Sequence, residues 1–161
     1  MSELINAYLT FSVGTNTFGV HVGKVVEILE YEKPKSVPES LPYITGVIDH
    51  RENIVPVIDT GLKFNLGPVD ITPQTCIVVL EIDKPGESGK FIIGAVVDSV
   101  SDVFESEMEK IKTIENDFKP GYISATYKTE ENLVMILNTE EVFNDKDIIA
   151  LDEIRKSIEA E

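Results

Sequence analysis

The amino-acid sequence predicts an all-β fold that consists of a duplicated small β unit followed by a C-terminal helix. Short runs of β-branched and apolar residues alternate with polar turns along most of the chain, as expected for strands and hairpins. The hairpin pattern of residues 46–64 reappears in residues 125–143, and residues 18–28 likewise match residues 93–103. After residue 143 the apolar residues change to helical spacing, which predicts the closing helix.

The repeated segments keep their register over several blocks. In the two hairpins the matched apolar and aromatic positions are Ile54, Val55, Val57, Ile58, Tyr43 and Phe64 in the first, and Leu133, Val134, Ile136, Leu137, Tyr122 and Phe143 in the second. A unit of this length exceeds the ~20–50 residues of solenoid repeats. Chance similarity between valine-rich strands is the alternative, but it would hardly preserve one register across separate blocks. We therefore interpret the pattern as an internal duplication.

The first segments of the chain predict a hairpin, a helical turn and an irregular connection. Residues 9–13 and 18–22 alternate between apolar and polar, and residues 14–16 form the turn between them. Residues 24–30 are expected to form a short helical turn that directs its apolar side chains inward. Three prolines then mark residues 34–42 as irregular.

The remaining elements follow in the order that the duplication requires. Residues 49–53 form the charged tip of the next hairpin, and Pro56 in its second strand indicates an edge or bulge position, because proline cannot donate to a ladder. Residues 75–82 and 91–97 are nearly continuous apolar strands. Residues 144–159 predict the closing helix, with an apolar stripe that must be buried.

Composition excludes several classes of function. The 161 residues include 42% hydrophobic and 27% charged residues, which is ordinary for a soluble globular protein. The net charge of −15 disfavours nucleic acid and anionic membranes as partners. No apolar run reaches the ~20 residues that span a bilayer. The N-terminal segment carries Glu3 and no basic residue, and Cys76 is the single cysteine, so we expect a cytoplasmic protein without a signal peptide.

No catalytic or metal-binding constellation is evident. His21 and His50 fall on separate segments, and Cys76 has no identifiable base partner, so it is expected to be a small buried hydrophobic residue. A zinc site needs more ligands than these three residues supply. The glycines of residues 86–90 lack the spacing and the strand-to-helix context of a phosphate loop. We therefore expect no catalytic residues, no cofactor and no metal.

The remaining candidate is a surface feature, Arg51 at the hairpin tip of a strongly acidic protein. Most tip arginines are solubilising turn residues, but a guanidinium is also a donor fork suited to a partner's carboxylate or carbonyl groups. Loops supported by a rigid β framework are frequent recognition sites. Glu27 and Asp102 occupy equivalent repeat positions, where an acid can also stabilise a turn. The residues by themselves leave these alternatives open.

Four segments together resemble the CheW family of chemotaxis coupling proteins. They are FGVHVGKVVEI, VPESLPYITGVIDHRENIVPVIDTGLKF, FIIGAVVDSVSDV and LVMILNTEEVF, which follow the family's order and spacing from about residue 8 to residue 143. The phrase GVI-xx-R-xx-IVPVID is the specific part. The resemblance implies two interlocked SH3-like five-stranded β-barrels and a C-terminal α-helix. The expected single domain, residues 1–161, then divides into a first barrel (14–70), a second barrel (7–13 and 75–143) and the helix (144–159).

The resemblance also implies an adaptor without enzymatic activity. Proteins of this family connect the cytoplasmic hairpin tips of chemoreceptors to the regulatory domain of the histidine kinase CheA. The protein would then be cytoplasmic and recruited to membrane receptor arrays, with no nucleic-acid partner and no direct insertion into the membrane. The alternative is a divergent adaptor of the same kind in another receptor–kinase pathway, such as surface motility.

Partner-binding residues transfer by position from the resemblance. Arg51 matches the family's tip arginine, Val25 and Glu27 match partner-contact positions, and Gly46 matches the glycine that opens the tip hairpin. Val100 matches the hydrophobic groove position of the second barrel, and Ile77 matches a strand residue near the same groove. The kinase contact would fall mainly on the first barrel, and a receptor helix would lie in the groove between the barrels.

The tip departs from the family's Asn-Leu-Arg-Gly, because residues 49–52 read Asp-His-Arg-Glu. The missing glycine removes a residue that adopts positive φ easily, and we expect Asn53 to take over that conformation. Glu52 also places a negative charge beside Arg51. The family's later Asp-Leu-Arg is Asp59-Thr60-Gly61 here, which removes a second basic group. The adaptor role therefore transfers, but the contact chemistry of the tip is expected to differ.

Overall fold

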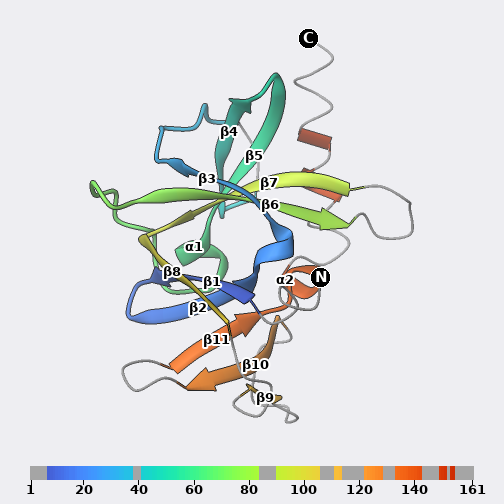
Figure 1. The fold of residues 1–161 in the computed structure, drawn as a ribbon. Helices are drawn as coiled ribbons and strands as arrows, with labels where there is room; N and C mark the ends of the chain where they lie inside the picture. The colour runs from blue at the N-terminus through green and yellow to red at the C-terminus, as the bar shows by residue number, and fades with distance from the viewer. Residues whose placement is uncertain are drawn as a thin grey trace.

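The computed structural model describes residues 7–37, 41–83, 90–105, 111–113, 122–128, 133–142, 149–151 and 153–154. Its elements in chain order are β1 (Ala7–Val13), β2 (Asn16–His21), the 3₁₀ turn η2 (Val22–Lys24), β3 (Val25–Glu30), β4 (Ile44–His50), β5 (Asn53–Asp59), α1 (Thr60–Lys63), β6 (Cys76–Asp83), β7 (Lys90–Val97), β8 (Ser99–Glu105), β9 (Ile111–Thr113), β10 (Ile123–Lys128), β11 (Leu133–Leu137) and α2 (Thr139–Val142). Strands dominate, which confirms the predicted all-β class. Figure 1 shows them in two groups, one above the other.

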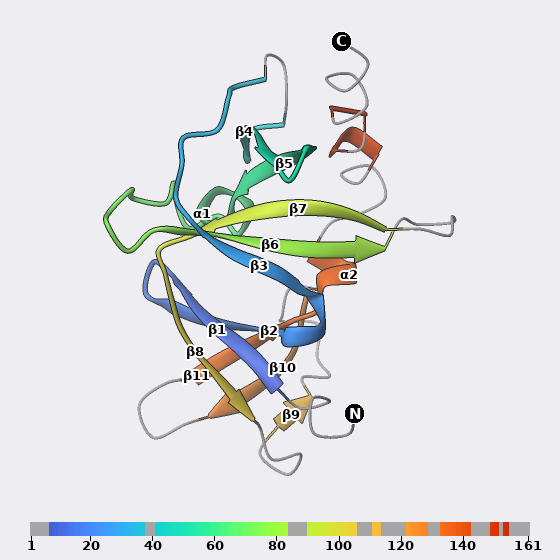
Figure 2. The ribbon, with the colours of Figure 1, turned by 45° about the horizontal axis from the view of Figure 1, so that its top comes forward.

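Both groups are sheets with the same underlying topology. Within the described residues, sheet A has the strand order β8-β1-β2-β11-β10-β9, and sheet B has the order β3-β6-β7-β5-β4. The two orders agree because β1–β3 correspond to β6–β8 in the repeat, and β4 and β5 correspond to β10 and β11. Strand β9 pairs with β10 at the edge of sheet A, where, among the described residues, the equivalent segment of sheet B makes only the isolated bridge from Lys35 to Val47 on β4. In Figure 2, β3 runs from the region of β2 to sheet B, and β8 runs from β7 to sheet A, so the two halves interlock.

Hydrogen bonds at matched positions support the duplication. The β4–β5 hairpin is closed by Asp59 N–H donating to the Tyr43 carbonyl at 2.7 Å, and the β10–β11 hairpin by Asn138 N–H donating to the Tyr122 carbonyl at 2.8 Å. Each hairpin also has a register shift near the start of its first strand. A short helix, α1 or α2, follows each of them. The two hairpins therefore share local geometry as well as sequence.

The principal core lies between the two sheets. It combines Leu9, Phe11, Val13, Phe18 and Val20 of sheet A with Val78, Leu80, Ile82, Ile93 and Val97 of sheet B, among others. A second cluster, the sheet B core, contains Ile48, Val55, Val57, Val69, Ile77, Val79 and Val96. Alternate residues of β6 enter these two cores, and this burial of both faces explains why residues 75–82 read as a continuous apolar strand.

A row of aromatic rings connects the sheets through the principal core. Phe11 stacks on Phe18 with a centroid separation of 5.9 Å, Phe18 lies 5.0 Å from Phe64, and Phe64 stacks on Tyr122 at 4.8 Å. Phe64 follows α1 of the first hairpin, whereas Tyr122 precedes β10 of the second. Because aromatic pairs bury large areas and prefer offset geometries, this row fixes the two sheets against each other.

The predicted helical turn at residues 24–30 is wrong. Residues 25–30 form strand β3, which pairs antiparallel with β6, and the 3₁₀ turn precedes it. Ile28, expected to point inward, is 42% exposed. The apolar residues of this segment are β-branched apart from Leu29, and β6 offers them a free edge, so strand pairing prevails over a short isolated helix.

The sheets do not follow the predicted sub-unit bounds of 14–70 for one barrel and 7–13 with 75–143 for the other. Strand β2 lies beside β1 in sheet A, and β6 and β7 lie in sheet B. The predicted bounds divided the β1–β2 hairpin at its tight turn, where Val13 pairs with Asn16. Strands joined by so short a turn remain neighbours. The segments that change sheet are instead β3 and β8.

Pro56 occupies an interior strand, β5, rather than an edge. Its partner across the β4–β5 ladder is Val47, whose N–H and carbonyl both bond to Lys35, at 2.9 Å each. The Val47–Pro56 pair is therefore not hydrogen-bonded. The absence of an N–H on Pro56 consequently removes no hydrogen bond from the β4–β5 ladder.

The described part of the C-terminal segment agrees with the predicted helix. Residues 149–151 and 153–154 are helical, Leu151 is fully buried in the principal core, and Ile154 packs against it. Ile149, expected in the same stripe, is 56% exposed. The rest of the range 144–159 lies outside the described residues. In the described part of the chain, no helix has the length and apolarity needed to span a bilayer.

Candidate functional site

The β4–β5 tip is a two-residue turn built from residues with side chains. Arg51 and Glu52 have φ angles of 53° and 68°. Positive φ at both central residues matches the type I′ turns that suit the twist of a β-hairpin. The expectation that Asn53 takes over this conformation is wrong. Asn53 begins β5, pairs with His50, and donates from Nδ2 to the Arg51 carbonyl at 3.3 Å.

The guanidinium of Arg51 folds back onto a carboxylate of another strand. Arg51 Nη2 lies 3.3 Å from Glu27 Oε2 and donates a hydrogen bond to Glu27 Oε1 at 3.4 Å. The Arg51 side chain is 72% exposed and that of Glu27 is 32% exposed. The structure thus brings together two predicted site residues that are 24 positions apart in the sequence.

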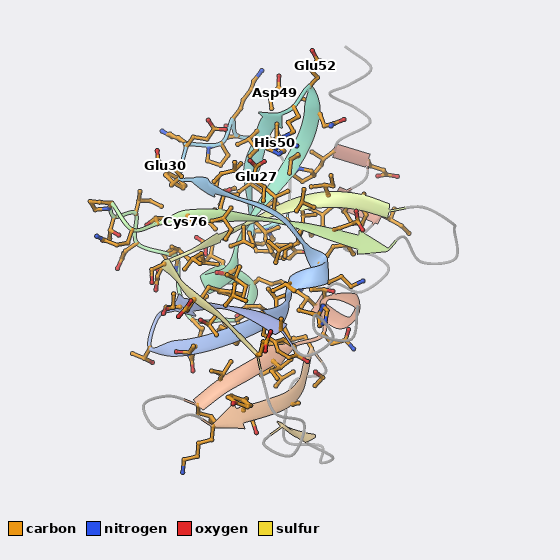
Figure 3. The ribbon with its side chains drawn as sticks, in the orientation of Figure 1. Glu27, Glu30, Asp49, His50, Glu52 and Cys76 are labelled. Atoms are coloured by element: carbon orange, nitrogen blue, oxygen red, sulfur yellow. The ribbon has the colours of Figure 1, made fainter. Side chains whose placement is uncertain are left out.

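His50 is a third member of this cluster, and no pattern in the sequence indicated it. Its Nε2 lies 2.8 Å from Glu27 Oε2, and its side chain is only 12% exposed. Neither of these atoms is accessible to solvent or makes a hydrogen bond of favourable angle within the described residues. Figure 3 shows His50 and Glu27 close together below the tip, with Asp49 and Glu52 further out along the hairpin. We call Glu27, His50 and Arg51 the tip cluster.

The tip cluster connects the two edge strands of sheet B, because Glu27 lies on β3 and His50 on β4. A second connection between these edges is the bridge from Lys35, after β3, to Val47 on β4. Gly46 makes this approach possible. Its φ is 149°, and a Cβ at this position would overlap the Lys35 carbonyl. Gly46 is buried, so its contribution is to the shape of the hairpin.

The other predicted site residues, Val25, Ile77 and Val100, are strand residues that contact or belong to the two cores. Val25 pairs with Leu80, Val100 pairs with Phe11, and both are half-buried against the principal core. Ile77 is fully buried in the sheet B core and has no surface to offer a partner in this structure.

The edge strands of both sheets expose apolar side chains that the sequence did not mark as surface. Val26 and Ile28 on β3 are 43% and 42% exposed, and Val103 on β8 is 53% exposed. Ile28 and Val103 are equivalent in the repeat. The misassigned helical turn hid this pattern, since it placed Ile28 on the inner side. Exposure alternates along β3, but its sequence Val-Val-Glu-Ile-Leu-Glu has no matching alternation of polarity, so the sequence offered no signal for the exposed face.

The buried acid Asp59 positions the segment that follows the tip hairpin. Its Oδ1 accepts from Leu62 N–H at 3.0 Å, which caps α1, and its Oδ2 accepts from Val69 N–H at 3.1 Å. Val69 is thereby held against the sheet B core. Asp59 is thus a structural acid, and Gly61 beside it approaches the Gly67 carbonyl too closely for a larger residue.

The remaining chemistry-bearing residues form no reactive centre in the described structure. Cys76 is half-buried, and its Sγ lies 3.3 Å from the Gln74 carbonyl, so it is less buried than predicted. His21 accepts from Gly23 N–H through Nδ1 at 3.0 Å and begins the 3₁₀ turn. Within the described residues, no three His, Cys, Asp or Glu side chains are arranged to hold a metal ion.

Comparisons with known proteins agree on one family. The family model of the CheW-like domain matches residues 7–147. A chemotaxis protein CheW from Klebsiella aerogenes is 27% identical over 153 residues, covering 93% of this chain and 89% of that protein. A chemotaxis protein CheW from Bacillus subtilis is 30% identical over 140 residues, covering 84% of this chain and 85% of its own length.

A solved structure shows the same fold. The crystal structure of the scaffolding protein TtCheW from Thermoanaerobacter tengcongensis superposes with a TM-score of 0.75 at 22% sequence identity, covering 88% of this chain and 94% of that one. The interlocked sheets, the duplicated hairpins and the tip arginine therefore occur in a chain that matches the family over most of its length. The protein belongs to the family of CheW-like domains.

Proposed function

We propose that the protein is a non-enzymatic adaptor that couples the cytoplasmic tips of chemoreceptors to the regulatory domain of the histidine kinase CheA. The observation that carries this proposal is the match of the CheW-like domain over residues 7–147. Its relatives are chemotaxis proteins, and the matched crystal structure is that of a scaffolding protein. The protein would act in the cytoplasm and join receptor arrays at the membrane through these partners.

The architecture suits the rigid presentation of two surfaces. One core holds sheets A and B together, and each sheet ends in an edge strand with exposed apolar side chains, β3 with Ile28 and β8 with Val103. Exposed edges are natural docking sites for a partner that presents its own strand. Because β3 and β8 are equivalent in the repeat, the protein offers two related docking edges at fixed relative positions.

Val25 and Val100 extend these edges toward the junction of the sheets. Both contact the principal core, which lies between sheets A and B. A receptor helix along this junction would contact both residues, and the tip cluster would orient a partner on sheet B. Each contact can be small, below ~1,200 Å², because a receptor array adds multivalency.

The test is binding to a receptor-tip fragment and to a CheA regulatory domain, measured separately by calorimetry. We expect the wild-type protein to bind both. Arg51→Ala should weaken at least one interaction while leaving the melting temperature unchanged. Lys128→Ala, the matched change at the exposed last residue of β10, should leave both affinities unchanged. Binding of neither partner by the wild-type protein would overturn the proposal.

A further inference from the structure

The tip cluster contains one carboxylate and two basic side chains that share it. Glu27 Oε2 lies 2.8 Å from His50 Nε2 and 3.3 Å from Arg51 Nη2. Glu27 Oε1 is bonded to Arg51 alone among the described residues. The two basic groups differ in exposure: the His50 side chain is 12% exposed and the Arg51 side chain 72% exposed. Arg51 can therefore leave the cluster for a partner, whereas His50 stays.

His50 is held in place by the strand that carries it. Residues two apart on a strand share a face, so His50 lies on the same face as Ile48, which is buried in the sheet B core. Across the hairpin, His50 pairs with Asn53, which carries no charge. The imidazole is thus fixed beside Glu27 whether or not a partner is present.

Besides β4 itself, three elements place charged groups at this end of sheet B. They are β3 with Glu27, the turn with Arg51, and β6 with Glu81, which lies on the same face as Val79, the residue opposite Glu27. On the hairpin itself, Asp49 and Glu52 are exposed, and Figure 3 shows both further out than His50. Glu27 is the carboxylate in contact with the imidazole, and Glu81 provides a matched control.

We propose that His50 is a positioning residue that releases Arg51 from Glu27 when its imidazole is protonated. When the imidazole is neutral, the guanidinium of Arg51 is the charged group that pairs with Glu27. A protonated imidazole neutralises Glu27 at 2.8 Å and repels the neighbouring guanidinium, and both effects weaken the Arg51–Glu27 pair. Imidazoles ordinarily change charge between pH 5 and 8. The tip would thus present a freer Arg51 when His50 is protonated, and the consequence for partners rests on the proposed adaptor function.

The isolated protein provides the first test, because it requires no partner. We expect the side-chain NMR signal of Arg51 Nε–H to shift in step with the ring signals of His50 as the pH is lowered. His50→Leu and His50→Gln should abolish this shift, and Glu81→Gln should preserve it. A constant Arg51 signal through the His50 titration, or an unchanged shift in both His50 variants, would overturn the proposal. Two variants are used so that a folding defect in one does not decide the outcome.

Binding to the CheA regulatory domain at pH 6 and pH 8 provides the second test. We expect wild-type affinity to differ by up to about fivefold, the scale of an exposed ion pair, with tighter binding at pH 6. His50→Leu should remove the part of the pH dependence that the NMR titration assigns to Arg51. If no binding occurs at either pH, the adaptor function fails, whereas the NMR titration still decides the role of His50.

Discussion

At the β4–β5 turn, two residues with Cβ atoms adopt backbone angles that glycine adopts most easily. Left-handed conformations cost an L-residue about 1–2 kcal/mol. Arg51 and Glu52 keep these angles because the strands on either side of the turn are anchored in the sheet B core by Ile48 and Val55. The same turn places Arg51 against Glu27, so one of the two strained residues is also a residue of the candidate site.

Replacing Glu52 with glycine should stabilise the protein. Glycine adopts a φ of 68° without the steric cost of a Cβ, and the expected gain is about 1 kcal/mol in the free energy of unfolding. Urea denaturation measures it. Glu30→Gly, at an exposed position of β3, is the control and should destabilise by about 0.5–1 kcal/mol. A loss of stability in Glu52→Gly would show that the Glu52 side chain contributes more than the strain costs.

Gly46→Ala should destabilise the protein by about 3 kcal/mol, because a Cβ at position 46 overlaps the Lys35 carbonyl and the φ of 149° strains any other residue. Gly14→Ala is the matched change, since Gly14 has a φ of 63° but open space around its Cβ position. It should cost only about 1 kcal/mol. Equal losses in thermal denaturation would mean that the Lys35–Val47 bridge adapts freely.

At the scale of elements, the short helix α1 and the long strand β6 are stabilised in different ways. Helix α1 depends on the Asp59 carboxylate at its N-terminus, whereas β6 depends on burial of both faces in two cores. Strand β3 is intermediate: one edge pairs with β6, and one face exposes Val26 and Ile28 to solvent. These differences determine which elements tolerate substitution.

Asp59→Ala should cost about 2–3 kcal/mol in stability. It removes the N-cap of α1 and leaves the buried Val69 N–H without an acceptor. Asp70→Ala, an exposed acid in the following segment, should change stability by less than about 0.5 kcal/mol. Chemical denaturation of the two variants gives the comparison, and similar values would contradict the role assigned to Asp59.

Lysine substitution of the exposed apolar residues tests the two edge strands separately. Ile28→Lys on β3 and Val103→Lys on β8 should leave the melting temperature nearly unchanged, because both side chains are about half exposed. Each substitution should lower the affinity for the partner that docks on the substituted strand by at least about tenfold, because a charge then becomes buried at the interface. Affinities for the receptor fragment and the kinase domain, measured for both variants, assign the edges. Unchanged affinities in both variants would show that neither edge is used.

For the whole molecule, the row of aromatic rings from Phe11 to Tyr122 joins the halves through one shared core. The interlocking of β3 and β8 means that neither sheet is formed by one half of the chain. We therefore expect the two sheets to unfold together. Rigid coupling of this kind keeps the edge strands β3 and β8 in constant relative orientation.

Alkaline pH should weaken this whole structure. Burial raises the pKa of Tyr8 and of Tyr122 above the ordinary value of 10.0. The unfolded chain therefore loses these protons first, so the stability is fully present below pH 10 and declines as the pH rises through the folded-state pKa. The double variant Tyr8→Phe, Tyr122→Phe should show a smaller decline above pH 10 in denaturation experiments. Below pH 9 its pH dependence should match that of the wild type, and an identical alkaline decline would contradict this explanation.

Much of the fold was predictable because neighbouring residues carry the information. The alternation of Leu9, Phe11 and Val13 predicts a strand with one buried face, and the polar residues 49–53 predict the tip between β4 and β5. Residues 24–30 were mispredicted because a short apolar segment fits a helical turn or a strand equally well. Pairing with β6, which is distant in sequence, decided between them.

The candidate site was predictable residue by residue but not as a cluster. Position in the family motif indicated Arg51 and Glu27, and no pattern indicated His50. Their contact depends on the approach of β3 to β4, the two edges of sheet B. The sequence by itself determined the strands, the duplication and the charged tip, because these follow from local periodicity. The tertiary structure alone decided which strands share a sheet and which side chains share Glu27, because those contacts form between residues far apart in the chain.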